Sequence, residues 1–188
     1  VTLTQSGVYS SGAAGSAISI TMSNSVSGTN VSTNYLLTQP VVTGIISRAA
    51  LGVSAEATYA SSTSVTPSSA TLTGLVSADS AATLTNLVLN NANVGSGLYT
   101  TAFTLSNGAQ ANYVLNGALN TTPGTDTTNT VTLNRATLTV TGTLSPSKTY
   151  DGTTSATITG GTLNGVQGSD LVTLTQSGVY SSGAAGSA

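Results

Sequence analysis

A stretch of seventeen residues, VTLTQSGVYSSGAAGSA, occurs twice in this chain of 188 residues, at positions 1–17 and again at 172–188. Chance does not reproduce seventeen positions in order, even in a composition rich in Ser, Thr, Ala and Gly. The two copies begin 171 positions apart, so the sequence contains one period of about 171 residues plus an overlap into the next. The duplication therefore predicts a tandem repeat.

A weaker repeat lies inside this period. The segment TYASSTSVTPSSATLTG, starting at Thr58, aligns with TYDGTTSATITGGTLNG, starting at Thr149, at an offset of 91 positions. Further along the chain, ANYVL at 111–115 resembles TNYLL at 33–37. The period therefore holds two diverged copies of one unit.

These correspondences predict three parts. Residues 48–134 form a complete domain, here called domain B. Residues 1–47 and 135–188, here called the N-terminal part and the C-terminal part, form the C-terminal and N-terminal halves of a sister domain, domain A. The 1–47 half belongs to a preceding repeat or to a neighbouring subunit.

The hydrophobic pattern is that of β-strands. Apolar residues alternate with Thr or Ser, as expected where one face of a sheet is buried, in the segments 18–23, 130–134, 137–142, 156–160 and 171–176. Residue pairs that accept positive φ in hairpin turns separate such segments: Asn107-Gly108, Asn116-Gly117, Asp151-Gly152 and Asn164-Gly165. We predict an all-β fold with two sister β-sandwich-like domains per period, stacked end to end.

Composition excludes several classes of function. Only 4% of the residues are charged, against about 25% in an ordinary globular chain. The three cations are too few to neutralise the phosphates of a nucleic acid or an anionic membrane. The chain has no Cys and no His, which removes thiol chemistry, imidazole catalysis and Cys/His zinc sites. We expect no enzymatic activity, no cofactor and no metal.

The few distinctive side chains have structural interpretations. Asp151 with Gly152 indicates a turn, and Asp79 and its counterpart Asp170 are expected to accept hydrogen bonds from backbone amides in loops. Lys148, the sole lysine, is interpreted as a strand-edge charge that discourages unwanted pairing.

Two pairs of tyrosines occupy matching places in the sister units. Tyr59 corresponds to Tyr150, and Tyr35 corresponds to Tyr113. In a chain with 4% aromatic residues, we expect paired tyrosines to anchor the cores, each with one hydroxyl to satisfy.

The segment SKTYDGTTSATITGGTLNGVQGSDLVTL, with the later NY and a closing apolar strand, resembles the YDG family of glycine-rich, mostly-β domains, which is related to the MBG domains. Domain B departs from the motif, with Ala60 and Ser61 in place of Asp-Gly. Such domains occur in tandem in large secreted bacterial adhesins and filamentous haemagglutinin-like proteins. The resemblance implies a non-enzymatic stalk module.

The expected function is thus a rigid, nearly uncharged spacer in an extracellular bacterial filament or adhesin, located outside the cell or on its surface. The expected partners are copies of the chain itself, either as tandem repeats of one polypeptide or as subunits that exchange strands. A carbohydrate- or ice-binding surface module is the alternative.

Overall fold

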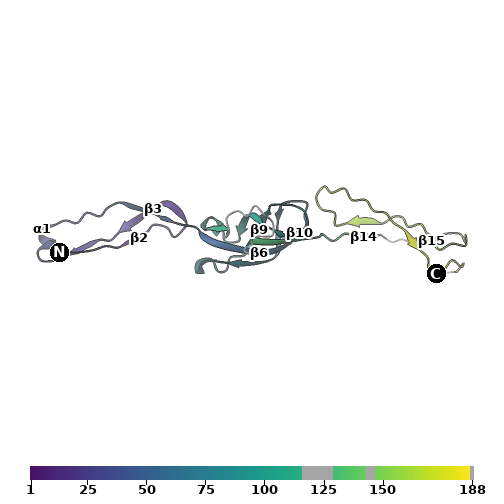
Figure 1. The fold of residues 1–188 in the computed structure, drawn as a ribbon, viewed down its shortest axis with the longest axis horizontal. Coiled ribbons are helices and arrows are strands. Elements are labelled where there is room, and N and C mark those ends of the chain that lie inside the picture. The colour runs from purple at the N-terminus through teal and green to yellow at the C-terminus, as the bar shows by residue number, and fades with distance from the viewer. Residues whose placement is uncertain (116–128, 143–146, 187–188) are drawn as a thin grey trace.

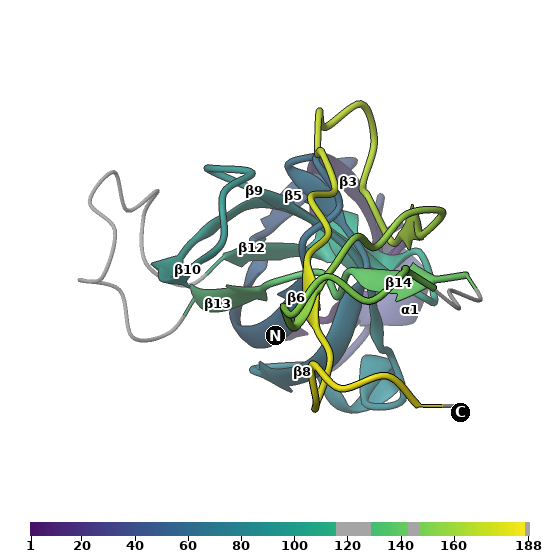
Figure 2. The ribbon, with the colours of Figure 1, turned by 90° about the vertical axis from the view of Figure 1, so that its right-hand side faces the viewer.

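The structure is a computed structural model that describes residues 1–115, 129–142 and 147–186. Its elements are strands and short helical turns, which confirms the all-β fold class. The chain is drawn out along one axis, with the N-terminal part at one end, domain B in the middle and the C-terminal part at the other end (Figure 1). Viewed along that axis, the three parts lie one behind another (Figure 2).

The N-terminal part contains two small antiparallel sheets. One sheet pairs β1 with β4, and the other has the strand order β2-β3-β5. A single helical turn, α1, precedes the extended Tyr35. The bounds are β1 Thr2–Thr4, β2 Gly7–Tyr9, β3 Gly15–Met22, β4 Ser25–Ser27, α1 Val31–Asn34 and β5 Val42–Ile46.

Domain B has two sheets. In the first, the long strand β6 pairs with β8 along one side and runs parallel to both β12 and β13, and β13 also pairs with β10. The second sheet has the order β11-β9-β7. The bounds are β6 Ala49–Thr58, β7 Ser64–Val65, β8 Pro67–Thr73, η1 Ser77–Asp79, β9 Leu84–Leu89, β10 Gly95–Leu98, β11 Thr100–Leu105, η2 Ala109–Asn112, β12 Tyr113–Leu115 and β13 Asn129–Asn134.

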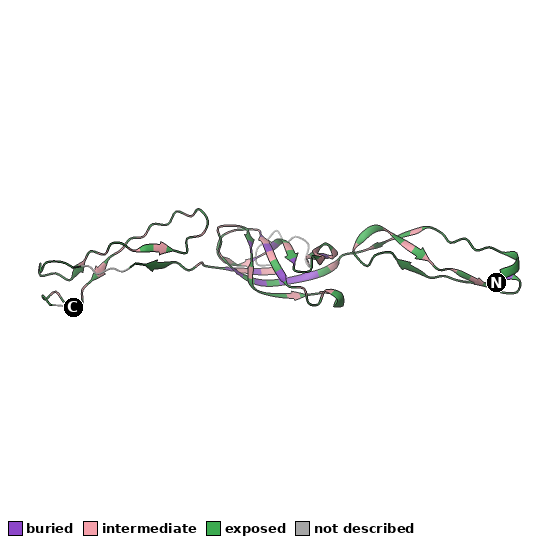
Figure 3. Ribbon diagram, turned by 180° about the vertical axis from the view of Figure 1, so that it is seen from behind, coloured by how far each residue is buried: buried purple, intermediate pink, exposed green. Residues whose placement is uncertain are grey.

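The core of domain B lies between these sheets. Strand β6 buries alternate residues such as Leu51, Val53 and Ala57, and these pack with Leu87 and Leu105 of the second sheet. Figure 3 shows that the buried residues concentrate in the middle of the molecule, whereas the two ends are mostly exposed. Domain B therefore has the sandwich-like core that the alternating pattern predicts.

The C-terminal part contains two short antiparallel pairs, β14 with β16 and β15 with β17. It buries no hydrophobic residue among those that the structure describes here. The bounds are β14 Thr139–Thr141, β15 Ser155–Ala156, β16 Thr162–Asn164 and β17 Gly178–Val179.

Some local expectations need correction. Residues 171–177 form no strand, and only Ser155–Ala156 is a strand in the region of 156–160. Gly108, Gly152 and Gly165 do have positive φ. However, their turns do not close hairpins, because the paired strands are not neighbours along the chain. The pair Asn116-Gly117 lies outside the described residues.

Candidate assembly site at the domain junction and the open sheet edges

Asp79 organises a polar cluster inside domain B. Its Oδ2 accepts a 2.7 Å hydrogen bond from the Tyr113 hydroxyl, and its Oδ1 accepts one of 2.7 Å from the Asn107 amide. The Tyr113 oxygen in turn accepts a bond from the backbone N–H of Val76. Tyr113 is 2% exposed, and its burial, followed by its hydrogen bond to Asp79, raises the pKa of the phenol. The cluster ties η1 to the start of β12.

Asp170, the counterpart of Asp79, lies at the junction between domain B and the C-terminal part. Its Oδ2 accepts a 2.8 Å hydrogen bond from the Tyr59 hydroxyl, and its Oδ1 accepts one of 3.0 Å from Ser61. Tyr59 and Asp170 also line a cleft of about 230 Å³ that residues of both parts enclose. The prediction of backbone donors was wrong for both aspartates, since the donors that reach them are side chains.

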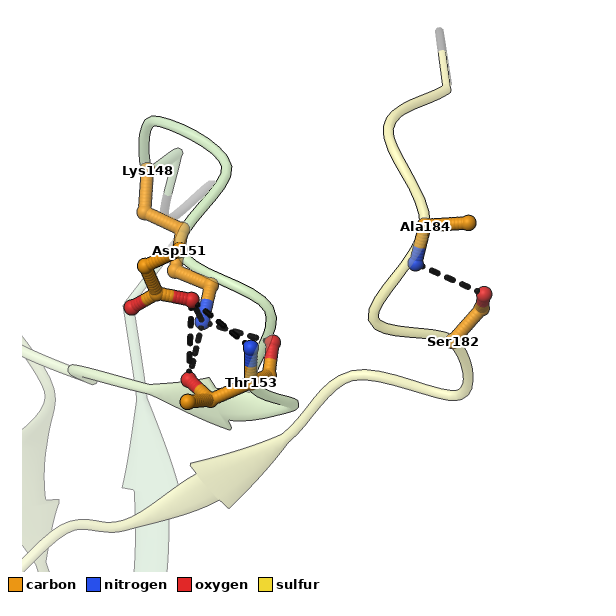
Figure 4. A network of polar contacts seen from close by, with 5 residues as sticks. All are labelled: Lys148, Asp151, Thr153, Ser182 and Ala184. Carbon is orange, nitrogen blue, oxygen red and sulfur yellow. Dashed lines mark hydrogen bonds and ion pairs between the residues drawn. The ribbon is translucent and has the colours of Figure 1, made fainter.

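Lys148, Asp151 and Thr153 form a turn in the C-terminal part (Figure 4). The Lys148 ammonium lies 2.8 Å from Asp151 Oδ1 and also donates to the Thr153 carbonyl and hydroxyl. Asp151 Oδ1 accepts the Thr153 N–H and hydroxyl. The Lys148 hydrogen bond, followed by those of Thr153, lowers the pKa of Asp151 to about 2. Figure 4 also shows the Ala184 N–H donating to Ser182 in a separate loop.

This turn confirms the interpretation of Asp151 and Gly152, whose φ is 76°. Ser61, at the matching position of domain B, also has a positive φ, of 55°, so both sister units make the turn although one lacks the glycine. Lys148 was predicted at a strand edge. It instead lies outside the strands, where its charge holds the turn and its Nζ sits 5.7 Å from the centre of the Tyr180 ring.

The prediction that the paired tyrosines anchor the cores is confirmed only for the two of them that lie in domain B. Tyr113 is a core residue, and Tyr59 is partly buried against the core of domain B. Tyr35 and Tyr150 are 71% and 66% exposed, so their assignment as core anchors was wrong for this structure. In the part of the chain that the structure describes, the buried hydrophobic cluster lies within domain B and includes neither ring, so neither has a core to pack into.

The terminal parts reproduce strand pairings of domain B. In β6–β8 the partners are Gly52 with Thr73 and Val53 with Leu72. In β14–β16 they are Thr139 with Asn164 and Val140 with Leu163. The second set lies 87 positions later on one strand and 91 on the other. The C-terminal part therefore contains a copy of the β6–β8 ladder in the same register.

Two glycines mark the same place in both copies. Gly74 has a φ of 88°, and a Cβ there would lie 2.3 Å from the Ala50 carbonyl oxygen. Gly165 has a φ of 93°, and a Cβ there would lie 2.3 Å from the Thr137 carbonyl oxygen. Both sister units therefore have the same close approach of two backbone segments at this glycine.

The N-terminal part reproduces other pairings of domain B. The pair Gly15 with Ile46 in β3–β5 corresponds to Gly95 with Leu133 in β10–β13. Strand β5 is therefore the counterpart of β13. Each of β5 and β14 is an edge strand in its own sheet, whereas β13 and β6 are paired with each other in domain B.

Sequence reasoning did not find this parallel β6–β13 pairing. The similarity of SRAALGV, at 47–53, to NRATLTV, at 134–140, fixes the offset at which β14 matches β6, but it does not indicate which strands pair. Among the described residues, no three His, Cys, Asp or Glu side chains gather in a group that could hold a metal ion. No helix in the described part of the chain has the length and hydrophobicity to cross a membrane.

Comparison with protein families gives one match. The YDG domain family model matches residues 134–188, just under a third of the chain. This part therefore carries a YDG-type domain sequence, and the strand pairings extend the structural likeness to domain B. Comparisons with curated proteins and with solved structures found no match.

Proposed function

We propose that this chain is a structural repeat module of an extracellular bacterial filament or adhesin stalk, acting as a rigid spacer without enzymatic activity. The observation that carries the proposal is the extended, end-to-end arrangement of units that share strand register (Figure 1). A module that contacts only its neighbours along one axis has the architecture of a repeat array.

The junctions support a spacer that resists bending. Only Arg135 to Leu138 lie between β13 and β14, and Tyr59 and Ser61 bind Asp170 across this connection. A short connection with specific contacts restricts relative motion of neighbouring units. At the other junction, the Ala14 N–H donates a 2.9 Å hydrogen bond to Oδ1 of Asn112 in domain B.

The low charge suits the same role. With a net charge of −2 over the whole chain, few ions need desolvation when rods lie side by side. Long-range repulsion between such rods is also weak, so their packing should depend little on ionic strength.

The proposal is tested with chains that carry one, two and three periods in tandem. Small-angle scattering should give a maximum dimension that grows in proportion to the number of periods at both low and high salt. A dimension that grows as the square root of the number of periods would indicate a flexible string and contradict the spacer role. Antibody labelling of intact cells of the source organism tests the extracellular location, and a glycan array or thermal-hysteresis response would favour the surface-binding alternative.

A further inference from the structure

We infer that the open edge of β14 in one copy of this chain binds β5 of a second copy, in the parallel register that β6 and β13 adopt within domain B. The occupant is thus residues 1–47 of another copy of the same sequence. This inference rests on the proposed repeat architecture only in requiring that copies meet head to tail. Beyond that architecture, the docking assigns the strands and the residue pairs that join the two copies.

The edges of β14 and β5 are complementary because each strand is paired on one side and can serve as the missing neighbour of the other. β14 is paired with β16 on one side, as β6 is paired with β8. β5 is paired with β3 on one side, as β13 is paired with β10. In domain B the remaining edges of β6 and β13 join through six parallel residue pairs. Among the described residues, no strand pairs with the corresponding edges of β14 and β5, so their backbone groups are available for such a partner.

The register follows from domain B. There, Asn129 to Val131 pair with Val53 to Ala55. The matching positions predict that Val42 pairs with Val140, Thr43 with Thr141 and Gly44 with Gly142. In the same way, the pairing of Tyr113 to Leu115 with Ala49 to Leu51 predicts that Tyr35 pairs with Ala136 and Leu37 with Leu138.

The docking would bury apolar side chains that lie along these paired segments. Leu138 is 46% exposed, whereas its counterpart Leu51 is fully buried. Tyr35 is exposed, whereas its counterpart Tyr113 is in the core. Leu36 and Thr137 correspond instead to Val114 and Ala50, which remain exposed in domain B. The terminal parts therefore present apolar residues at the positions that are inward-facing in the completed unit, and this burial would drive association.

The duplicated segment is the central strand of the second sheet. In domain B, β9 pairs with β11 on one side and with β7 on the other. The copy in β2 makes the first type of pairing, since Tyr9 with Ile20 matches Leu89 with Thr100. The copy in β17 makes the second type, since Ala156 with Gly178 matches Val65 with Leu87.

One copy of this strand is sufficient for the joined unit, so the other must leave. Within the described residues, β2 pairs with β3 through three residue pairs, and the backbone N–H groups of Ser10 and Ser23 continue this pairing at its two ends. β17 pairs with β15 through two residue pairs, and the Tyr180 N–H continues that pairing at one end. Residues 172–186 are therefore displaced, and β2 of the incoming copy pairs with β15. The amides of Gly178 and Val179 should then exchange faster with solvent on association.

Two variants of the full chain test the docking. Tyr35→Asp blocks the N-terminal surface, and Leu138→Asp blocks the C-terminal surface. Both positions are substantially exposed in the single chain, so neither change should unfold it. Each variant alone should remain a monomer of about 18.3 kDa in sedimentation experiments. An equimolar mixture should form a dimer of twice that mass and stop there, because each variant keeps one competent surface.

Matched controls and a cross-link fix the register. Leu36→Asp and Thr137→Asp lie on the outward face and should leave association within about two-fold of the unsubstituted chain. The chain has no cysteine, so Thr43→Cys in the Leu138→Asp variant and Thr141→Cys in the Tyr35→Asp variant should form a disulfide-linked dimer only when mixed. Thr137→Cys in place of Thr141→Cys lies about 13 Å away along the strand and should not cross-link.

Several results would overturn the inference. These are a mixture that stays monomeric at millimolar concentration, single variants that still assemble, or cross-linking at Thr137 in preference to Thr141. Assembly by the single variants would mean that the copies associate through another surface. If the mixture stays monomeric while tandem chains remain extended in scattering, the spacer proposal stands and only this docking fails.

Discussion

The hydroxyl of Tyr59 in domain B donates a 2.8 Å hydrogen bond to Asp170 in the segment that the YDG family model matches. Ser61 donates to the second oxygen of the same carboxylate. One aspartate thus receives two side chains from the preceding unit. The bond joins residues 111 positions apart and ties domain B to the C-terminal part.

Loss of the tyrosine hydroxyl should loosen the junction without unfolding domain B. In Tyr59→Phe the aromatic ring still packs on the core, so the free energy of unfolding of domain B should fall by no more than about 1 kcal/mol. NMR relaxation should show that domain B and the C-terminal part tumble more independently. Tyr150→Phe is the matched control, because the exposed Tyr150 should leave both measurements unchanged. Equal effects of the two variants would contradict the assigned role.

Tyr113 should matter far more to stability than its counterpart Tyr35. Tyr113→Phe leaves the Val76 N–H without its acceptor and removes one donor from Asp79, which should cost about 1–3 kcal/mol in urea denaturation. Tyr35→Phe changes an exposed side chain and should stay within about 0.5 kcal/mol. A similar loss for both variants would show that Tyr35 is also buried in the free chain.

Gly74 should tolerate no side chain. Gly74→Ala combines a φ of 88° with a Cβ 2.3 Å from the Ala50 carbonyl oxygen, so β6 and the turn after β8 must move apart. The left-handed conformation alone costs about 1–2 kcal/mol, and the clash adds to that cost. Gly108→Ala is the control, since its φ is 72° but nothing lies within 4 Å of the added Cβ. The midpoint temperature of thermal unfolding of domain B should be well below that of Gly108→Ala in the Gly74→Ala variant, and the reverse order would contradict the close approach.

Asp151 should titrate at low pH. The hydrogen bond from Lys148, followed by those from the Thr153 N–H and hydroxyl, lowers the pKa of Asp151 in the folded turn to about 2, so the ionised carboxylate favours the folded turn. Its contribution is complete above the unfolded pKa of about 3.9 and is lost as the pH falls through about 2. The Asp151 carboxyl ¹³C shift should report a midpoint near 2.

Lys148→Met is the control for this titration. It should move the Asp151 midpoint upward while leaving it below the ordinary value, because the Thr153 N–H and hydroxyl still donate to the carboxylate. An unchanged midpoint would mean that the Thr153 bonds, and not the ion pair, lower the pKa.

Part of the fold and of the candidate site could be predicted from local sequence signals. The alternation of apolar and hydroxyl residues indicated strands such as β3 and β13, because side chains on a strand alternate between two faces. The Asp151-Gly152 pair indicated a turn, because the aspartate can accept its own backbone N–H two residues on. The parallel pairing of β6 with β13 could not be predicted in this way, because no short-range signal specifies which distant edges meet.

The repeated seventeen residues separate what sequence determined from what tertiary structure decided. The sequence by itself determined that the period exists, that two sister units share it, and that both are built of strands. Tertiary structure decided what each copy becomes: Thr2–Thr4 is a strand paired with β4, whereas the identical residues 173–175 form none. A segment becomes a β-strand only when its backbone forms hydrogen bonds with a neighbouring strand, and a tyrosine becomes a core residue only when a second sheet packs over it. Neither partner is encoded within the segment itself, and so identical residues adopt different structures at the two ends.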